Sequence, residues 1–304
     1  EMLRSLVGSE MCIRDRYDKD MKTCYAKFDV PGVFRCPLCM APLALSGQSL
    51  LCANGHCFDV SAKGYVNLAA GRGQSVKYDK ALFESRGALL RDGFYAHVLD
   101  AVADVLASDV PRRVLDAGCG EGYYARALAQ RLGAELYAFD LSRDAIMLAA
   151  RGGSPVRLMV ADMTNIPLQT GTMDAVLDAF SPAHYGEYAR VLKPGGLLVK
   201  VIPAPEHLFE LRRIAKGQLS RESYESSRDV EAYFSSHFHL LETREVARTL
   251  PLDAVQRAHL VRMTPLLFGV DAASLSLESL NEITIAARLL IGRVQPEACE
   301  TTAK

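Results

Sequence analysis

The sequence predicts an α/β protein in which a doubly wound, mostly parallel sheet follows a small β-rich segment with clustered Cys and His residues. Two observations carry this prediction. Residues 109–205 alternate apolar strand-like runs with helix-like runs, which is the order of repeated βαβ units. Residues 33–70 are rich in Cys, Pro and Gly and have short apolar pairs in place of a helical period, which is typical of a small ribbon.

The composition limits the classes of protein. The chain has 304 residues, of which 49% are hydrophobic and 23% charged, so one domain of about 200 residues plus a smaller module fits it. A net charge of −1 excludes a globally basic surface, so any nucleic-acid contact has to be local. No apolar run reaches about 18 residues, so we expect no membrane contact. Four of the eight cysteines cluster and the others are scattered, which indicates a cytoplasmic protein.

The first residues carry no fold signal. The chain opens with Glu1, and "SLVGSEMCIRDR" resembles the translated adapter sequence found at the ends of some gene models. We expect residues 1–20 to be an artefactual or disordered tail and Met21 to be the natural start.

The ribbon segment has the spacing of a metal site. Cys36 and Cys39 form one knuckle, and Cys52 and His56 form the second. Zinc prefers four such ligands in a tetrahedron, and four protein ligands leave no open position, so the site is expected to be structural. Adjacent side chains of an extended segment point to opposite faces, so only one of His56 and Cys57 can reach the metal. The spacing alone leaves an all-cysteine site with Cys57 open.

Residues 71–108 are expected to be a linker followed by helices. "AAGRGQSVKYDK" is polar and contains glycine, and apolar residues then recur with a helical period from Ala81 to about Ala107. The interruption "DGFY" predicts two helices in place of one.

The segment "VLDAGCGEGYY" predicts a cofactor-binding turn between a strand and a helix. Gly118, Gly120 and Gly122 have the spacing GxGxG, whereas a dinucleotide-binding turn reads GxGxxG. Glu121 would repel a pyrophosphate but tolerates the sulfonium and ammonium groups of S-adenosylmethionine. An NAD site or a purely structural turn is the alternative.

Two more acids follow at the expected strand ends. Asp140 can accept hydrogen bonds from both ribose hydroxyls, and Asp162 can meet the adenine amino group. The candidate cofactor-binding residues are Asp116, Gly118, Gly120, Glu121, Gly122, Tyr123, Asp140, Leu141, Asp162 and Met163.

Residues 109–205 thus resemble a class I S-adenosylmethionine-dependent methyltransferase with a Rossmann-like fold. "FRCPLC", "LLCANGHCFDVSAKGYVNL", "ALFESRGALLRDGFY" and "HLVRMTPLLF" extend the likeness to the 23S rRNA guanine-N1 methyltransferase family. The resemblance implies a methyltransferase domain over 109–304 and a zinc ribbon that helps to hold RNA. It also implies that Cys36, Cys39, Cys52 and His56 bind Zn2+. Two branches of this family modify neighbouring guanines of one hairpin, and the sequence does not place the chain in either.

The resemblance also implies an RNA-contacting segment. Arg86 and Tyr95 match a family segment that often reads "ARRxFLxxGHY", but Gly87 replaces its second Arg and Phe94 its His. Residues 60–91 carry six basic and two acidic residues. The candidate RNA contacts are Lys77, Lys80, Arg86 and Tyr95. The alternative for these charges is a solvated linker.

The chemistry requires a place for the proton of guanine N1. By position, Asp178 and His184 are candidate bases, although a strand-end hydrogen bond and a helix start are their plainer roles. Pro182 is expected to turn backbone carbonyls toward the target base. The alternatives to an rRNA methyltransferase are a small-molecule methyltransferase and a non-catalytic RNA-binding protein.

Two expectations concern the whole molecule. Because the zinc and cofactor sites fall in separate modules, His56→Ala should lower zinc content and leave the affinity for S-adenosylmethionine nearly intact. A homodimer, in which one ribbon serves the other subunit's substrate, is compatible with the sequence.

Overall fold

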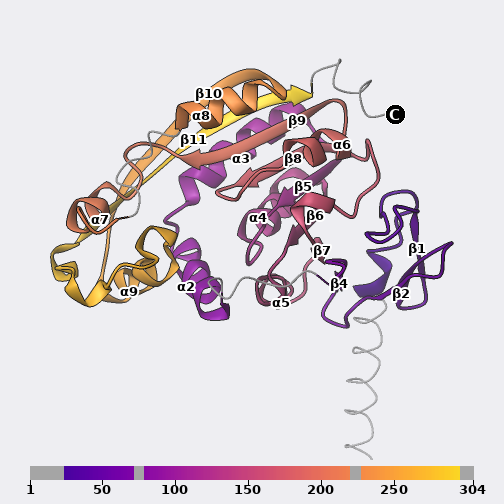
Figure 1. Cartoon of the computed structure of the whole chain (residues 1–304), viewed down its shortest axis with the longest axis horizontal. Helices are drawn as coiled ribbons and strands as arrows, with labels where there is room; N and C mark the ends of the chain where they lie inside the picture. Colours follow the sequence, from indigo (N-terminus) through magenta and orange to yellow (C-terminus); the bar gives the residue numbers. More distant parts are fainter. Residues whose placement is uncertain (1–23, 72–78, 220–226, 295–304) are drawn as a thin grey trace, which may run out of the picture.

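The computed structural model describes residues 24–71, 79–219 and 227–294 (Figure 1). The expected tail, its Met21 start and Lys77 lie outside these ranges.

An eight-stranded sheet forms the centre of the molecule, in the order β10-β11-β9-β8-β5-β6-β7-β4 (Figure 1). Its neighbours pair in parallel from β4 to β9, whereas β11 and β10 are antiparallel additions at one edge. The strands are β4 (Tyr65–Asn67), β5 (Arg113–Ala117), β6 (Glu135–Asp140), β7 (Arg157–Val160), β8 (Met173–Ala179), β9 (Leu192–Pro203), β10 (Phe238–Pro251) and β11 (Glu282–Val294). The predicted Rossmann-like order is confirmed.

Helices cover both faces of this sheet, because the central strands are apolar on both sides and need cover on each. They are α2 (Lys80–Arg91), α3 (Ala96–Asp109), α4 (Tyr123–Leu132), α5 (Arg143–Ala149), α6 (Tyr185–Val191), α7 (Phe209–Ile214), α8 (Ser227–Ser235) and α9 (Ala254–Met263). The 3-10 turns are η1 (Met163–Asn165), η2 (Pro265–Leu267), η3 (Ala272–Ser274) and η4 (Leu277–Ser279). The "DGFY" break separates α2 from α3 as predicted.

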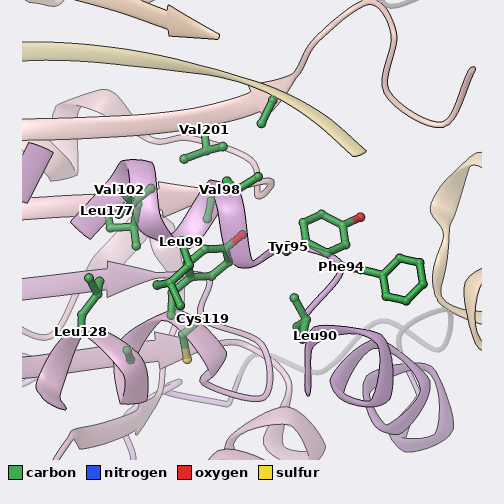
Figure 2. Close-up of a cluster of buried hydrophobic side chains, with 14 of the residues drawn as sticks. Leu90, Phe94, Tyr95, Val98, Leu99, Val102, Cys119, Leu128, Leu177 and Val201 are labelled. Carbon is green, nitrogen blue, oxygen red and sulfur yellow. The ribbon is translucent and has the colours of Figure 1, made fainter. Parts of the chain in front are cut away.

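Alternate residues of each strand serve two cores. Val114 of β5 packs with α3 and α4, whereas its neighbour Leu115 packs on the opposite face with α6 and the ribbon. Figure 2 shows the first core, with Val98 and Leu99 of α3 packed near the sheet, and Tyr95 where α2 leads into α3. This packing fixes the carboxyl ends of the strands, where the candidate site lies.

The ribbon consists of three short antiparallel strands: β1 (Leu43–Ser46), β2 (Ser49–Cys52) and β3 (Cys57–Asp59). The segment that follows it does not stay separate. β4 pairs in parallel with β7 and becomes the last strand of the central sheet. The ring of Phe34 also lies 6.0 Å from the ring of Tyr137 on β6. The ribbon and the sheet domain therefore share a core.

The Pro-Gly-Gly sequence at 194–196 is part of a strand. Such a sequence is typical of a tight turn, but β9 already begins at Leu192. Leu192 pairs with Met173 and Leu197 with Ala175, so the Pro-Gly-Gly residues form an irregular stretch inside the strand. A Cβ on Gly196 would lie 2.9 Å from the carbonyl oxygen of Lys193, which explains the need for glycine there.

Among the helices of the described ranges, none has the length and apolar character that a membrane crossing requires.

Candidate active site and metal centre

A cavity of about 650 Å³ opens at the carboxyl ends of β5 to β9, between the sheet, α2 and the segment from α9 to η2. Ligands bind at this edge in open α/β sheets. Its wall contains these residues: Leu82, Phe83, Arg86, Leu90, Tyr95, Gly118, Tyr124, Phe139, Asp140, Leu141, Ser142, Ala161, Asp162, Met163, Phe180, Ser181, Pro182, Pro203, His207, Leu208, Arg212, Met263, Thr264, Pro265 and Leu266.

The glycine turn forms part of the floor of this cavity. Gly118 has φ +73°, and a Cβ there would lie 2.6 Å from Ser181 Oγ. Gly122 has φ +77°, and its Cβ would lie 2.9 Å from the Cβ of Ala149. Both positions need glycine for backbone conformation and for space. At Gly118 the turn therefore brings bare backbone against the cavity, as an adenosyl cofactor requires.

Asp140 ends β6 and lines the cavity. Its carboxylate accepts hydrogen bonds from the backbone N–H groups of Gly120 at 2.9 Å and Ser142 at 2.8 Å. Burial raises the pKa of Asp140, and these two N–H groups oppose the rise. Each carboxylate oxygen has a further lone pair, so Asp140 can still accept hydroxyl hydrogen bonds.

Asp162 follows β7 on the same side of the cavity, next to Met163. Its Oδ1 accepts from the backbone N–H of Thr164 at 2.8 Å and from Thr164 Oγ1 at 2.9 Å, so the carboxylate begins η1. Leu141 lies between the two acids on the cavity wall. Asp140, Leu141, Asp162 and Met163 are thus brought together where the sequence places the ribose and adenine.

Other candidates of the turn lie behind the cavity. Asp116 is buried and accepts from the N–H of Ala125 at 3.1 Å. Burial raises the pKa of Asp116 to about 7, and Arg86 opposes the rise. Neither Asp116, Gly120, Glu121, Gly122 nor Tyr123 is among the residues of the cavity wall.

Glu121 is the least satisfied group of the site. Its side chain is buried, and neither carboxylate oxygen has a hydrogen-bond partner among the described residues. The cation beside it is Arg86, whose Nε lies 3.7 Å from Oε2. Burial works against the charge of Arg86, but the nearby carboxylates, first that of Glu121, raise its pKa above the usual value. This negative setting suits a cationic cofactor.

Tyr124 occupies the position that the sequence suggested for Tyr123. Tyr124 lines the cavity, and its buried hydroxyl has no hydrogen-bond partner among the described residues. The two rings pack edge to face with centroids 5.2 Å apart. Adjacent helix residues point about 100° apart, and the sequence does not reveal which of the pair faces the sheet edge. An unpaired hydroxyl, an acid pair and a bare glycine turn together fit S-adenosylmethionine.

The candidate bases do not face the cavity. Asp178 is 0% exposed and lies under the loop after β8. It accepts from Lys200 Nζ at 2.8 Å, Ser181 Oγ at 2.7 Å and Tyr188 OH at 2.9 Å. His184 caps α6, and its Nδ1 accepts from the N–H of Glu187 at 3.1 Å. Asp178 therefore makes hydrogen bonds at the end of a strand, and His184 begins a helix. These are the plainer of the two roles considered for each residue.

The carbonyl groups of the Ser181-Pro182 loop also point elsewhere than expected. Lys200 Nζ donates to the carbonyl oxygen of Ser181, and the carbonyl oxygen of Pro182 lies 3.5 Å from the hydroxyl of Tyr188. Residues of this loop line the cavity instead. The first of them, Phe180, has a positive φ of +58°.

Sequence reasoning missed several residues of the cavity. His207 comes from the connection after β9, Arg212 from α7, and Met263 to Leu266 from the end of α9. The resemblance of "HLVRMTPLLF" pointed toward the last group. No motif signals His207, because its place depends on how β9, β11 and α7 pack together.

The expected RNA contacts separate into two groups. Lys80 is exposed and pairs with Glu84 at 3.6 Å on the surface of α2. Arg86 and Tyr95 instead line the cavity. Gly87, the departure from the family segment, lies against the turn, since a Cβ there would be 3.4 Å from Cγ of Glu121. Because glycine has no Cβ, α2 can pack closely over the glycine turn at this position.

The metal ligands of the ribbon converge. The ligand atoms of Cys36, Cys39, Cys52 and His56 all lie within 4.8 Å of one another. His56 Nδ1 is 3.5 Å from Cys36 Sγ and 3.4 Å from Cys52 Sγ, and Cys39 Sγ is 3.7 Å from Cys52 Sγ. Zinc–ligand bonds of about 2.0–2.3 Å give tetrahedral edges of about 3.4–3.8 Å, so these atoms fit zinc. Cys57 is exposed.

The metal knuckle is fastened directly to the cofactor side of the sheet. The carbonyl oxygen of Pro37, between two ligands, accepts from Asn165 Nδ2 at 2.9 Å. Arg35 donates to Asn165 Oδ1 at 2.8 Å and lies 3.4 Å from Glu187. Asn165 ends η1, the turn that Asp162 begins. The two candidate sites are therefore linked by one short segment.

Comparison with known proteins matches both parts of the chain. The family model described as "Methyltransferase domain" covers residues 114–196, and the one described as "RlmA, N-terminal" covers residues 34–70. The demethylmenaquinone methyltransferase of Thermus thermophilus is 34% identical over 122 residues, which is 36% of this chain.

Two relatives match almost from end to end. The 23S rRNA (guanine(748)-N(1))-methyltransferase of Streptomyces fradiae is 33% identical over 279 residues, or 88% of this chain and 99% of the relative. YxjB of Bacillus subtilis, which carries the same family name, is 35% identical over 279 residues, or 86% of this chain and 97% of the relative. Since the likeness runs through ribbon and sheet domain alike, the chain belongs to the 23S rRNA (guanine-N(1)-)-methyltransferase family.

Proposed function

We propose that this protein methylates N1 of a guanine in a hairpin of 23S rRNA, with S-adenosylmethionine as the methyl donor. The observation that carries the proposal is the attachment of the metal knuckle to η1, the turn that Asp162 begins, through Pro37 and Asn165, in a chain related over most of its length to such enzymes. A small-molecule methyltransferase needs no second module beside its cofactor.

S-adenosylmethionine, when bound, supplies an electrophilic methyl group. Asp140 would hold its ribose, Asp162 its adenine, and the glycine turn would face its amino-acid part. The chain's main contribution to rate is alignment, because a well-oriented pair of reactants reacts far faster than a free pair. A cofactor and a base bound together in the cavity of about 650 Å³ would displace water from around the methyl group.

The ribbon would act on the RNA and not on the methyl group. Cys36, Cys39, Cys52 and His56 would hold Zn2+ with no open position, so the metal would stabilise the ribbon fold. The knuckle residues Leu38 and Met40 are 54% and 48% exposed. Lys80 and Lys77 would add charge for the RNA backbone.

A labelling experiment tests this function. The purified protein is incubated with S-adenosylmethionine labelled in the methyl group. One reaction contains unmodified 23S rRNA, and a separate reaction contains a small-molecule extract of the cells from which the rRNA was prepared. We expect label in the RNA alone. Label in the extract and not in the RNA would favour a small-molecule methyltransferase, and no binding of S-adenosylmethionine by calorimetry would exclude both enzymes.

Location and assembly follow from the same proposal. We expect the protein to work in the cytoplasm, where rRNA is, and the described cysteines are all free thiols. A homodimer stays a proposal, and light scattering of the purified protein decides between it and a monomer.

A further inference from the structure

Three rings meet at one end of the cavity: Tyr95, Phe180 and His207. Phe180 and His207 are stacked, with centroids 5.8 Å apart and planes at 23°. Tyr95 packs edge to face on Phe180 at 5.6 Å and lies 6.2 Å from His207. Such an aromatic group gives a flat, water-excluding surface for a base.

These rings lie away from the acids assigned to the cofactor. Phe180 follows β8 and His207 follows β9, whereas Asp140 and Asp162 follow β6 and β7. In the sheet, β5 separates β8 and β9 from β6 and β7. A cofactor held over β6 and β7 therefore leaves the end over β8 and β9 for the target base.

His207 is a polar member of this aromatic end, and the fold fixes its tautomer. The residue is 5% exposed. Its Nδ1 lies 3.2 Å from the backbone N of Ala286 on β11, and that N–H must donate, so Nδ1 is the acceptor. Burial also lowers the pKa of His207 to about 4, so the ring is neutral near pH 7. A neutral imidazole whose Nδ1 accepts carries its proton on Nε2.

We propose that the Nε2–H of His207 donates a hydrogen bond to O6 of the target guanine, and that it thereby selects guanine and stabilises the base as N1 loses its proton. The inference rests on the proposed function. In the reaction a bond forms between N1 and the methyl carbon, the sulfonium S–C bond breaks to leave a thioether, and the N1 proton leaves to solvent. His207 keeps its own proton throughout.

The chemistry of the two purines makes this contact selective. Guanine presents a carbonyl oxygen at C6, which accepts, and adenine presents an amino group, which would face the N–H donor of His207. Removal of the N1 proton places negative charge on O6, and hydrogen bonds to a charged acceptor are stronger. The contact is therefore stronger in the transition state than in the ground state, as catalysis requires.

Two substitutions separate the hydrogen bond from the stacking. His207→Phe keeps a flat ring and removes the donor, whereas His207→Gln keeps an N–H donor and removes the ring. His97→Phe is the matched control, because His97 Nε2 bonds to the carbonyl of Ile285, the residue before Ala286, and His97 does not line the cavity. The rate is measured on an rRNA hairpin whose methylated guanine has been mapped with the wild type, per S-adenosylmethionine site counted by calorimetry.

We expect His207→Phe to lower kcat on the order of 100- to 1,000-fold, as loss of one donor to a developing oxyanion does. Its kcat should recover as the pH rises and N1 ionises without help. His207→Gln should keep most of the rate, and His97→Phe should match the wild type. Full activity of His207→Phe, or an active Phe variant beside an inactive Gln variant, would overturn the proposal. A wild type that leaves rRNA unmodified would instead reject the proposed function.

Discussion

Gly118 shows how a single residue controls the cofactor site. It has a positive φ, and the atoms nearest to an added Cβ belong to Ser181, which Asp178 and the carbonyl of Ala117 hold in place. Ser181 cannot move away without breaking these bonds. Gly118 is therefore required twice, for conformation and for space.

Gly118→Ala should lower the affinity for S-adenosylmethionine at least about 10-fold, since a contact of 2.6 Å must be relieved by moving the turn. Gly133→Ala is the control: Gly133 also has a positive φ, +62°, but nothing lies within 4 Å of its added Cβ. Calorimetric titration of both variants distinguishes crowding from backbone strain. Equal affinities of the two would contradict this account of the turn.

Asp116 is expected to make the stability of the protein depend on pH. Its folded pKa of about 7 lies above the ordinary value of 3.8, so the folded state binds more protons between these values and stability falls as pH rises through them. The effect is on the order of 4 kcal/mol at most, by 1.36 kcal/mol per pKa unit.

Asp116→Asn removes this titration and keeps an oxygen for the N–H of Ala125. The variant should therefore gain stability relative to the wild type as the pH rises from about 4 to about 7, between the unfolded and folded pKa values of Asp116, as measured by urea unfolding. A difference in unfolding free energy that stays constant with pH would show that Asp116 titrates normally.

At the scale of elements, the loop between β8 and α6 is held by a buried ion pair. Lys200 of β9 is 4% exposed and bonds both Asp178 and the carbonyl of Ser181. Tyr188 of α6 completes the network. The network holds Phe180 at the cavity in a left-handed conformation that a Phe rarely adopts.

Lys200→Met should cost about 3–5 kcal/mol of unfolding free energy, because it leaves the buried charge of Asp178 without its cation. The double variant Asp178→Asn with Lys200→Met should cost far less than the sum of the two single changes. Urea unfolding of all four proteins gives this double-mutant cycle. Additive losses would show that the pair does not act as a unit.

The same elements show what a sequence can predict. The order from β5 to β9 followed from local signals: the glycine turn, the strand-end acids and the alternation of periods. The pairing of β4 with β7 did not, because three residues carry too little pattern to indicate a partner about 90 residues away. His207 was missed because its role depends on β11, which comes from a distant part of the chain and fixes the tautomer of the ring.

At the scale of the whole molecule, the ribbon and the cofactor site are mechanically connected. The hydrogen bond from Asn165 to Pro37 runs from η1 to the knuckle between Cys36 and Cys39. The ribbon also contributes to the core on one face of the sheet. These contacts change the expected effect of His56→Ala.

His56→Ala should lower zinc content, and it should also weaken S-adenosylmethionine binding a few-fold, because a loose knuckle no longer holds η1 and Asp162. Cys57→Ala is the control and should change neither, since Cys57 is exposed and outside the cluster. Metal analysis and calorimetry measure the two quantities. An unchanged affinity in the zinc-depleted variant would restore the view of two independent modules.

We propose that this cavity directs a methyl group to N1 of one guanine in 23S rRNA. The most direct test is mass spectrometry of nucleosides and fragments from 23S rRNA that has been incubated with the protein and S-adenosylmethionine. We expect a single 1-methylguanosine, located in one hairpin. Methylation at another guanine atom, on another base, or at many unrelated guanines would contradict it.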